Sequence, residues 1–143
     1  MELYRRENYL KKIRGFYHDS EMIKVITGVR RCGKSSLMQT IVEELKEQGV
    51  PEANLVFLDL DSKKHKSIKK PEQLEQEIDK LCSAEGMKYL FIDEIQNIIG
   101  FEEIINAYRG EKEYSVFITG SNSYLLSGEL ITKLTGRYIE IEM

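Results

Sequence analysis

The sequence predicts an α/β protein in which short buried strands alternate with amphipathic helices. An apolar run at 22–27 is followed by a glycine-rich loop and then by apolar residues at helical spacing. Further apolar runs at 54–61, 88–94 and 114–119 have the length and composition of buried strands. Acidic or small polar residues end these runs, and ligands of open α/β sheets bind at the carboxyl ends of the strands.

The segment 28–35, GVRRCGKS, fits the phosphate-binding pattern G-x-x-x-x-G-K-[ST] at every fixed position. Gly28 and Gly33 let the backbone bend so that successive N–H groups point at phosphate oxygens. Lys34 brings a positive charge to the β and γ phosphates. Ser35 offers a hydroxyl to Mg²⁺ and opens a helix, whose N-terminal dipole favours an anion. We therefore expect this segment, the phosphate loop, to bind a nucleoside triphosphate.

The flanks of the loop distinguish this prediction from a glycine turn that happens to precede a lysine. A strand before the loop and a helix after it are the arrangement that phosphate binding requires. The helix shows apolar residues from Leu37 to Leu45 and ends before Gly49 and Pro51. The nucleotide-contacting residues predicted here are Gly28, Val29, Arg30, Arg31, Cys32, Gly33, Lys34, Ser35 and Ser36.

Composition indicates one soluble domain. The chain has 143 residues, of which 31% are charged and 41% hydrophobic. The net charge of −3 gives no general attraction to nucleic acid or to an anionic membrane. No apolar run is long enough to span a bilayer, and the N-terminus lacks the apolar core of a signal peptide. Cys32 and Cys82 make no disulfide framework, which favours a cytoplasmic location.

Residues 1–21 are expected to form a helical segment that packs on the core, residues 22–143. Its apolar face comprises Tyr9, Leu10, Ile13, Phe16 and Tyr17. It either packs on the sheet edge or lies in part over the adenine base. The basic run at 63–70 predicts a solvated loop. The alternative is that this run contacts nucleic acid or an acidic partner. His65 within this run is expected at the surface, and Pro71 begins the next helix.

Two adjacent carboxylates end the apolar run at 88–92. Buried strands do not gain stability from carboxylates at their ends, where both repel and lose hydration. Phosphoryl-transfer chemistry gives them roles: we predict Asp93 as the Mg²⁺ residue and Glu94 as the base that activates the attacking water. The alternative is a helix N-cap followed by a solvated acid.

Small polar residues follow the run at 114–119. Asn122 and Ser121 are candidates to hydrogen-bond the γ-phosphate or the lytic water, and Asn122 is the predicted catalytic member. The alternative is a turn with a helix N-cap. Arg137 precedes a last alternating strand. It either stabilises charge on the phosphoryl group of a neighbouring subunit or pairs with an acid in its own chain.

These motifs, taken in order, resemble those of the AAA+ superfamily ATPases of bacteria and archaea. The segments that carry the resemblance are 27–35, 91–97, 118–122 and 134–138. The resemblance implies a three-layer α/β/α fold with a five-stranded parallel sheet of order 5-1-4-3-2. It implies Lys34 and Ser35 as the Walker A pair, Asp93 and Glu94 as the Walker B pair, and 120–122 as the first sensor. It also implies a helical lid and a C-terminal domain, and both are expected to lie outside this chain. Without the lid, the isolated core is expected to be weakly active.

The function expected from these residues is Mg²⁺-dependent ATP hydrolysis. A homo-oligomer is required if Arg137 acts on a neighbouring subunit. ATP is preferred to GTP because no guanine-reading motif follows the fourth strand. One alternative is a nucleotide-dependent switch that binds ATP and rarely hydrolyses it. Another is a helicase-like ATPase, since residues 93–96 read D-E-I-Q. A small-molecule kinase would need an acceptor site and a lid that the sequence does not display.

Overall fold

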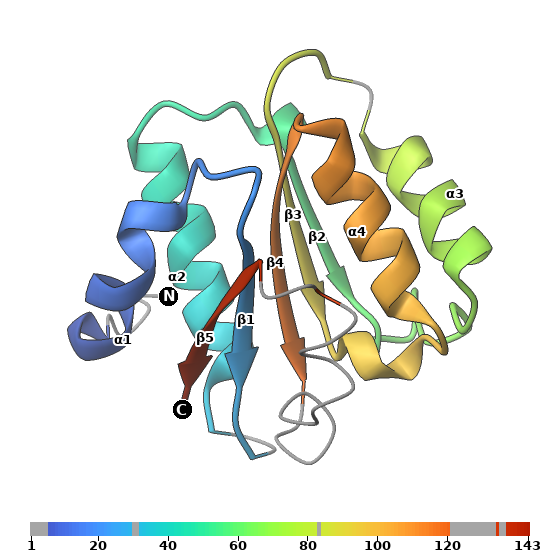
Figure 1. Ribbon diagram of the computed structural model, residues 1–143, viewed down its shortest axis with the longest axis horizontal. Coiled ribbons are helices and arrows are strands. Elements are labelled where there is room, and N and C mark those ends of the chain that lie inside the picture. Colours follow the sequence, from blue (N-terminus) through green and yellow to red (C-terminus); the bar gives the residue numbers. More distant parts are fainter. Residues whose placement is uncertain (1–5, 30–31, 83, 121–133, 135–136) are drawn as a thin grey trace.

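The computed structural model describes residues 6–29, 32–82, 84–120, 134 and 137–143 (Figure 1). The helices are α1 (Glu7–Ile13), α2 (Lys34–Glu47), α3 (Pro71–Leu81) and α4 (Phe101–Glu111), with short 3-10 turns η1 (Arg14–Phe16), η2 (Glu52–Asn54) and η3 (Ile95–Asn97). The strands are β1 (Ile23–Thr27), β2 (Leu55–Asp59), β3 (Lys88–Asp93), β4 (Tyr114–Gly120) and β5 (Tyr138–Glu142).

The five strands form one parallel sheet of order β2-β3-β4-β1-β5. This is the predicted order 5-1-4-3-2, and the fold class is confirmed. Because every strand runs in the same direction, their carboxyl ends meet at one edge of the sheet. The turn from β1 to α2, which carries the phosphate loop, lies at that edge, the lower one in Figure 1.

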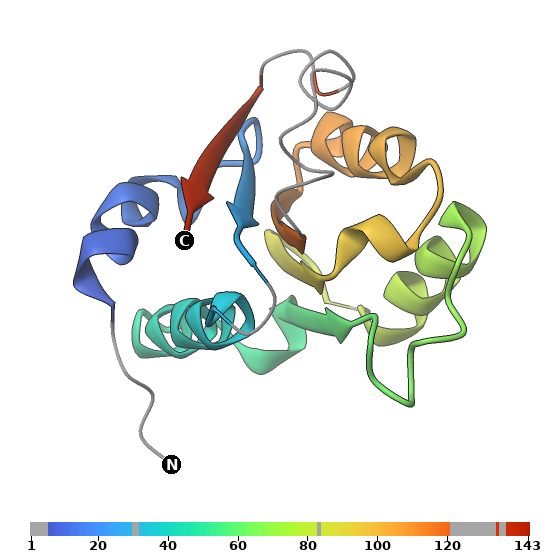
Figure 2. The same cartoon turned by 90° about the horizontal axis from the view of Figure 1, so that it is seen from below.

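Helices cover both faces of the sheet, giving three layers (Figure 2). α3 and α4 lie on one face, where Leu74, Ile78, Phe101 and Ile105 pack on Leu90, Ile92, Val116 and Ile118. α1 and α2 lie on the other face, where Leu10, Ile13, Met38 and Ile41 pack on Ile26, Phe91, Phe117 and Ile141. β1, β3 and β4 are buried along their whole length because helices cover both their faces.

The N-terminal segment contributes to the second of these cores. The side chains of Leu10, Ile13 and Tyr17 have no exposed surface. Tyr17 meets Phe117 of β4 edge to face, with ring centroids 6.2 Å apart. The observed packing is therefore against the face of the sheet and α2, in the same core as the central strands. Among the described residues, no helix combines the length and hydropathy needed to cross a bilayer.

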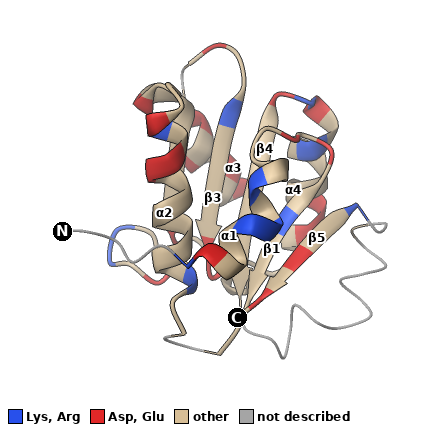
Figure 3. Ribbon diagram, turned by 90° about the vertical axis from the view of Figure 1, so that its left-hand side faces the viewer, with Lys and Arg blue, Asp and Glu red and all other residues tan. Residues whose placement is uncertain are grey.

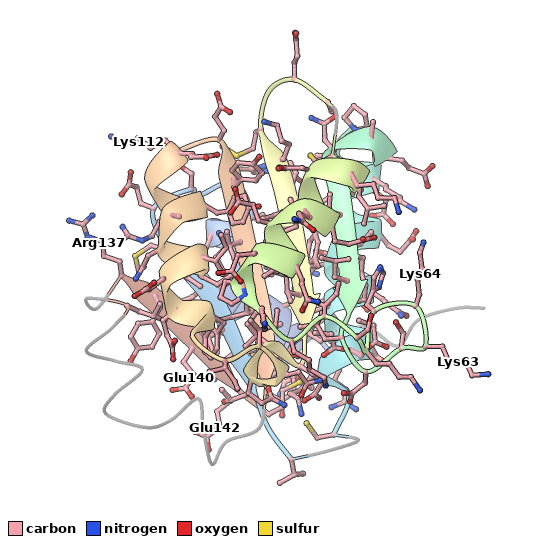
Figure 4. All side chains as sticks on the ribbon, turned by 90° about the vertical axis from the view of Figure 1, so that its right-hand side faces the viewer. Lys63, Lys64, Lys112, Arg137, Glu140 and Glu142 are labelled. Atoms are coloured by element: carbon pink, nitrogen blue, oxygen red, sulfur yellow. The ribbon has the colours of Figure 1, made fainter. Side chains whose placement is uncertain are left out.

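The basic run differs from its prediction at one residue. Lys63 and Lys64 are exposed and point outward, as expected for a loop (Figure 4). His65, expected at the surface, is only 7% exposed, and its Nε2 lies 3.3 Å from Oε1 of Glu77 in α3. The reason is that Ile68, three residues later, is buried in the core beside α3 and holds the loop against that helix.

A lysine is buried in the middle of β1. Lys24 has no exposed surface, and its ammonium donates to the carbonyl of Asp19 at 2.6 Å and to Oγ of Ser115 at 2.8 Å. The ammonium also lies 4.8 Å from the centre of the Phe117 ring. Burial lowers the pKa of Lys24 to about 7. Folding is therefore opposed by the desolvation of this charge at neutral pH.

The stability of the protein should reflect this titration. Between pH 7 and 10.5 the unfolded chain keeps the Lys24 proton while the folded chain has released it, so the free energy of unfolding should rise with pH. The expected slope is about 1 kcal/mol per pH unit. Urea denaturation of the wild type and of Lys24→Met measures it, with Lys80→Met on the exposed side of α3 as the matched control. A wild-type slope identical to that of Lys24→Met would contradict this.

Candidate functional site

The phosphate loop borders a cavity at the carboxyl edge of the sheet. The cavity has a volume of about 240 Å³ and is lined by Gly33, Lys34, Ser35, Ser36, Asp93 and Glu94. The first four come from the loop and the first turn of α2, and the last two from the end of β3. The cavity thus brings together the predicted Walker A and Walker B residues, which are about sixty positions apart in the sequence.

The glycines of the loop are required by close contacts and backbone conformation. Gly33 precedes α2 with a φ of +103°, a left-handed value that other residues rarely adopt. A Cβ atom at Gly28 would lie 2.5 Å from Sγ of Cys32. Lys34 folds back over the loop, where its Nζ donates to the carbonyls of Gly28 and Val29 at 2.9 and 3.1 Å. Its charge is therefore held beside the cavity by weak acceptors that an anion can replace.

The predicted metal residues are in contact with each other. The carboxyl group of Asp93 is almost fully buried and accepts hydrogen bonds from the hydroxyls of Ser35 and Thr119. Burial raises the pKa of Asp93, while these two hydrogen bonds oppose the rise. Asp59, which pairs with Asp93 in the register of β2 and β3, raises it further by its charge.

This oxygen-rich pair suits Mg²⁺ rather than a fully protein-ligated metal. The described part of the chain holds no group of three His, Cys, Asp or Glu side chains positioned around one ion. Mg²⁺ usually takes one or two protein oxygens and completes its shell with water and phosphate oxygens. Ser35 and Asp93 fit that demand, because both present an oxygen to the same cavity.

Glu94 is held in an unusual backbone conformation. Its φ of 62° and ψ of 50° place it in the left-handed region, which a non-glycine residue adopts only at a cost of about 1–3 kcal/mol. Its N–H donates to Oγ1 of Thr119 at 3.1 Å. Its carboxylate accepts a hydrogen bond from Nε2 of Gln96, and the other amide atom of Gln96, Oε1, is buried with no partner among the described residues. Glu94 in this conformation lines the cavity beside Asp93.

Two residues that contact the site, Thr119 and Arg6, were not predicted from the sequence. Thr119 links both carboxylates: its hydroxyl donates to Asp93 and accepts from the N–H of Glu94. The only sequence signal is a polar residue at the end of an otherwise apolar run. Arg6, at the start of α1, donates from Nη1 to the carbonyl of Cys32 at 3.0 Å. No local pattern connects residue 6 to the loop, so sequence reasoning had no signal for that contact.

Of the other predicted residues, those that the structure describes are not among the residues that line the cavity. Arg30, Arg31, Ser121 and Asn122 lie outside the described residues. Val29 is 67% exposed. Arg137 is exposed just before β5, at the opposite end of the sheet from the loop, with Nη1 at 3.9 Å from Oε2 of Glu21 (Figure 4). Arg137 therefore lies at the opposite end of the strands from the cavity of its own chain.

Loss of the Thr119 hydroxyl should destabilise the protein. Thr119→Val keeps the shape of the side chain but leaves the buried Asp93 carboxylate and the Glu94 N–H without that partner. The expected cost is about 2 kcal/mol in the free energy of unfolding, measured by chemical denaturation. Thr40→Val is the matched control, because the buried Thr40 hydroxyl donates to the carbonyl of Ser36 within its own helix. Equal costs for the two variants would show that Thr119 has no special role.

Comparisons with known proteins agree with this architecture. A family model described as an AAA domain matches residues 20–143. An uncharacterized protein of Haemophilus influenzae is 42% identical over 139 residues, covering 96% of this chain and 34% of that protein. An uncharacterized protein of Methanocaldococcus jannaschii is 33% identical over 122 residues, covering 85% of this chain and 26% of that protein. The chain thus spans about a third or less of the curated relatives it matches.

A solved structure shares the fold at low sequence identity. The AMPPCP-bound DnaA from Aquifex aeolicus superposes with a TM-score of 0.56 at 18% identity, covering 95% of this chain and 44% of that chain. The predicted resemblance is therefore confirmed by the family model and, at the level of fold, by this structure. The chain belongs to the AAA domain family and has the fold of an AAA+ core.

Proposed function

We propose that this chain binds ATP with Mg²⁺ and hydrolyses it to ADP and phosphate. The observation that carries the proposal is the convergence of Lys34, Ser35, Asp93 and Glu94 on one cavity at the carboxyl edge of the sheet. Each has a role that hydrolysis of a phosphoanhydride needs: a cation, two oxygen ligands for a metal, and a base.

The roles follow from the contacts. Lys34 exchanges its two loop carbonyls for phosphate oxygens, which are stronger acceptors because they are charged. Ser35 and Asp93 would hold Mg²⁺, which when bound would neutralise part of the phosphate charge. Glu94 accepts a proton from the attacking water as the bond from water oxygen to the γ-phosphorus forms and the bond to the β–γ bridging oxygen breaks. ADP then leaves with that bridging oxygen.

A nucleotide-dependent switch is the second candidate, and one contact favours it. The Glu94 carboxylate is paired with the Gln96 amide rather than directed only at the cavity. A base held this way binds a lytic water less readily, so ATP would remain bound for longer. The two candidates differ only in the rate of phosphate release.

Two substitutions separate binding from hydrolysis. Lys34→Ala should weaken ATP binding by at least tenfold, because the charge beside the phosphates is lost. Glu94→Gln should leave ATP affinity within a few-fold and lower phosphate release at least a hundredfold, since a base is removed. Calorimetric titration and a phosphate-release assay measure the two effects. ATP binding without turnover in the wild type would leave two explanations, a switch or a core that needs its lid for turnover, and no ATP binding at all would refute both candidates.

We further propose that Arg137 acts on the site of a neighbouring copy. Its position at the far edge of the sheet from its own phosphate loop supports action between subunits. The relatives are longer than this chain, so the C-terminal domain of the full-length protein is a further proposed partner, and contact with nucleic acid through 63–70 stays a prediction. A cytoplasmic location suits the free thiols of Cys32 and Cys82.

Complementation tests the role of Arg137. Arg137→Ala and Glu94→Gln should each be inactive alone, because each lacks one half of every shared site. Mixing them should restore phosphate release at interfaces that join an intact Glu94 to an intact Arg137. Lys112→Ala, an exposed cation at the end of α4, serves as the control and should be active alone. An Arg137→Ala variant with wild-type activity would remove Arg137 from the mechanism.

A further inference from the structure

The guanidinium of Arg6 lies against the phosphate loop at Cys32 and Gly33. A Cβ atom placed on Gly33 would meet Nη2, Cζ and Nη1 of Arg6 at 2.9, 3.1 and 3.3 Å. The same guanidinium donates from Nη1 to the carbonyl oxygen of Cys32 at 3.0 Å. Arg6 therefore contacts the peptide unit that joins Cys32 to Gly33, the N-cap residue of α2.

That contact fixes the direction of one N–H group. In a trans peptide unit the C=O and the N–H point to opposite sides. With the Cys32 carbonyl turned toward Arg6, the N–H of Gly33 is directed away from Arg6. Gly33 lines the cavity, whereas Arg6 is not among the residues described around it. We infer that the Gly33 N–H points away from Arg6 and toward the cavity, where a phosphate group would bind.

An ion network holds the segment that follows Arg6 against α2. The guanidinium of Arg14 pairs with Glu7 at 2.7 and 2.9 Å and with Glu44 of α2 at 2.7 and 3.0 Å. The hydroxyl of Tyr17 also donates to Glu44 at 2.7 Å, and Glu44 is almost fully buried. Figure 3, which views the molecule from the side on which α1 and α2 lie, shows basic and acidic positions on α1 and acidic positions on α2. The network ties residues 7–17 to the helix whose first turn begins the cavity.

We propose that Arg6 is a positioning residue for the phosphate loop, and that the N-terminal segment thereby sets the affinity for nucleotide. This rests on the proposed function, since it concerns the same nucleotide site. Arg6 acts through the Cys32–Gly33 peptide and does not touch the phosphates. Its loss lets that peptide rotate, and the loop must then be ordered when nucleotide binds. ATP and ADP are affected alike, because the Gly33 N–H serves the phosphates common to both.

The test compares nucleotide affinity in matched variants of the purified protein. Arg6→Ala should weaken ATP and ADP binding by the same factor, roughly tenfold. Lys12→Ala removes the same charge from an exposed position of α1 and should leave both affinities unchanged. Phosphate release at saturating ATP should stay within about twofold of wild type in Arg6→Ala, because the base Glu94 is not altered. Loss of ATP binding alone, with ADP binding intact, would overturn the proposal in favour of direct contact with the γ-phosphate.

A second measurement needs neither nucleotide nor activity. The amide resonance of Gly33 in the nucleotide-free protein should shift in Arg6→Ala and stay in place in Lys12→Ala. An unchanged Gly33 resonance in Arg6→Ala would overturn the positioning role. Thermal unfolding of Arg6→Ala confirms that the variant is folded.

These outcomes also separate this inference from the proposed function. If wild type binds ATP, Lys34→Ala binds it at least tenfold more weakly, and Arg6→Ala binds it like wild type, only the role of Arg6 fails. If wild type binds no ATP, the proposed function fails, and the Gly33 resonance still reports whether Arg6 orients the loop.

Discussion

The buried carboxylate of Asp93 is the constraint on which the functional edge of the molecule depends. A charge in an apolar sheet is stable only if hydrogen bonds replace its lost water. Thr119 from β4 and Ser35 from α2 supply those hydrogen bonds, so three elements meet at one group. The same Thr119 hydroxyl accepts the N–H of Glu94 and supports its left-handed backbone. Stability and the geometry of the site therefore arise from the same contacts.

A second chain of contacts connects the N-terminus to the phosphate loop. Apolar burial of Leu10, Ile13 and Tyr17 holds the segment on the sheet. The ion network between Arg14 and Glu44 fixes it to α2. The N-terminal segment and the cavity are therefore connected through α2, which contacts both.

Local sequence patterns predicted much of the fold and of the candidate site. The loop pattern at 28–35 and the run ending in Asp93 and Glu94 were identified because spacing and residue type carry the chemistry directly. The strand order came from resemblance to AAA+ proteins and agrees with the observed sheet. His65 was placed wrongly because its burial depends on Ile68 and α3, which no local pattern around a basic run reveals. Thr119 and Arg6 were missed for a similar reason.

The sequence by itself determined the alternation of strands and helices, the position of the phosphate loop and the two carboxylates that follow β3. These depend on hydrophobic periodicity, backbone freedom at glycine and residue spacing, which are properties of neighbours along the chain. Only the tertiary structure decided that Thr119 bridges Asp93 and Glu94, that Arg6 lies on the Cys32–Gly33 peptide, and that Arg137 is at the far edge of the sheet. Each is a contact or a separation between residues far apart in sequence, fixed by the order and direction of the strands and by the packing of α1.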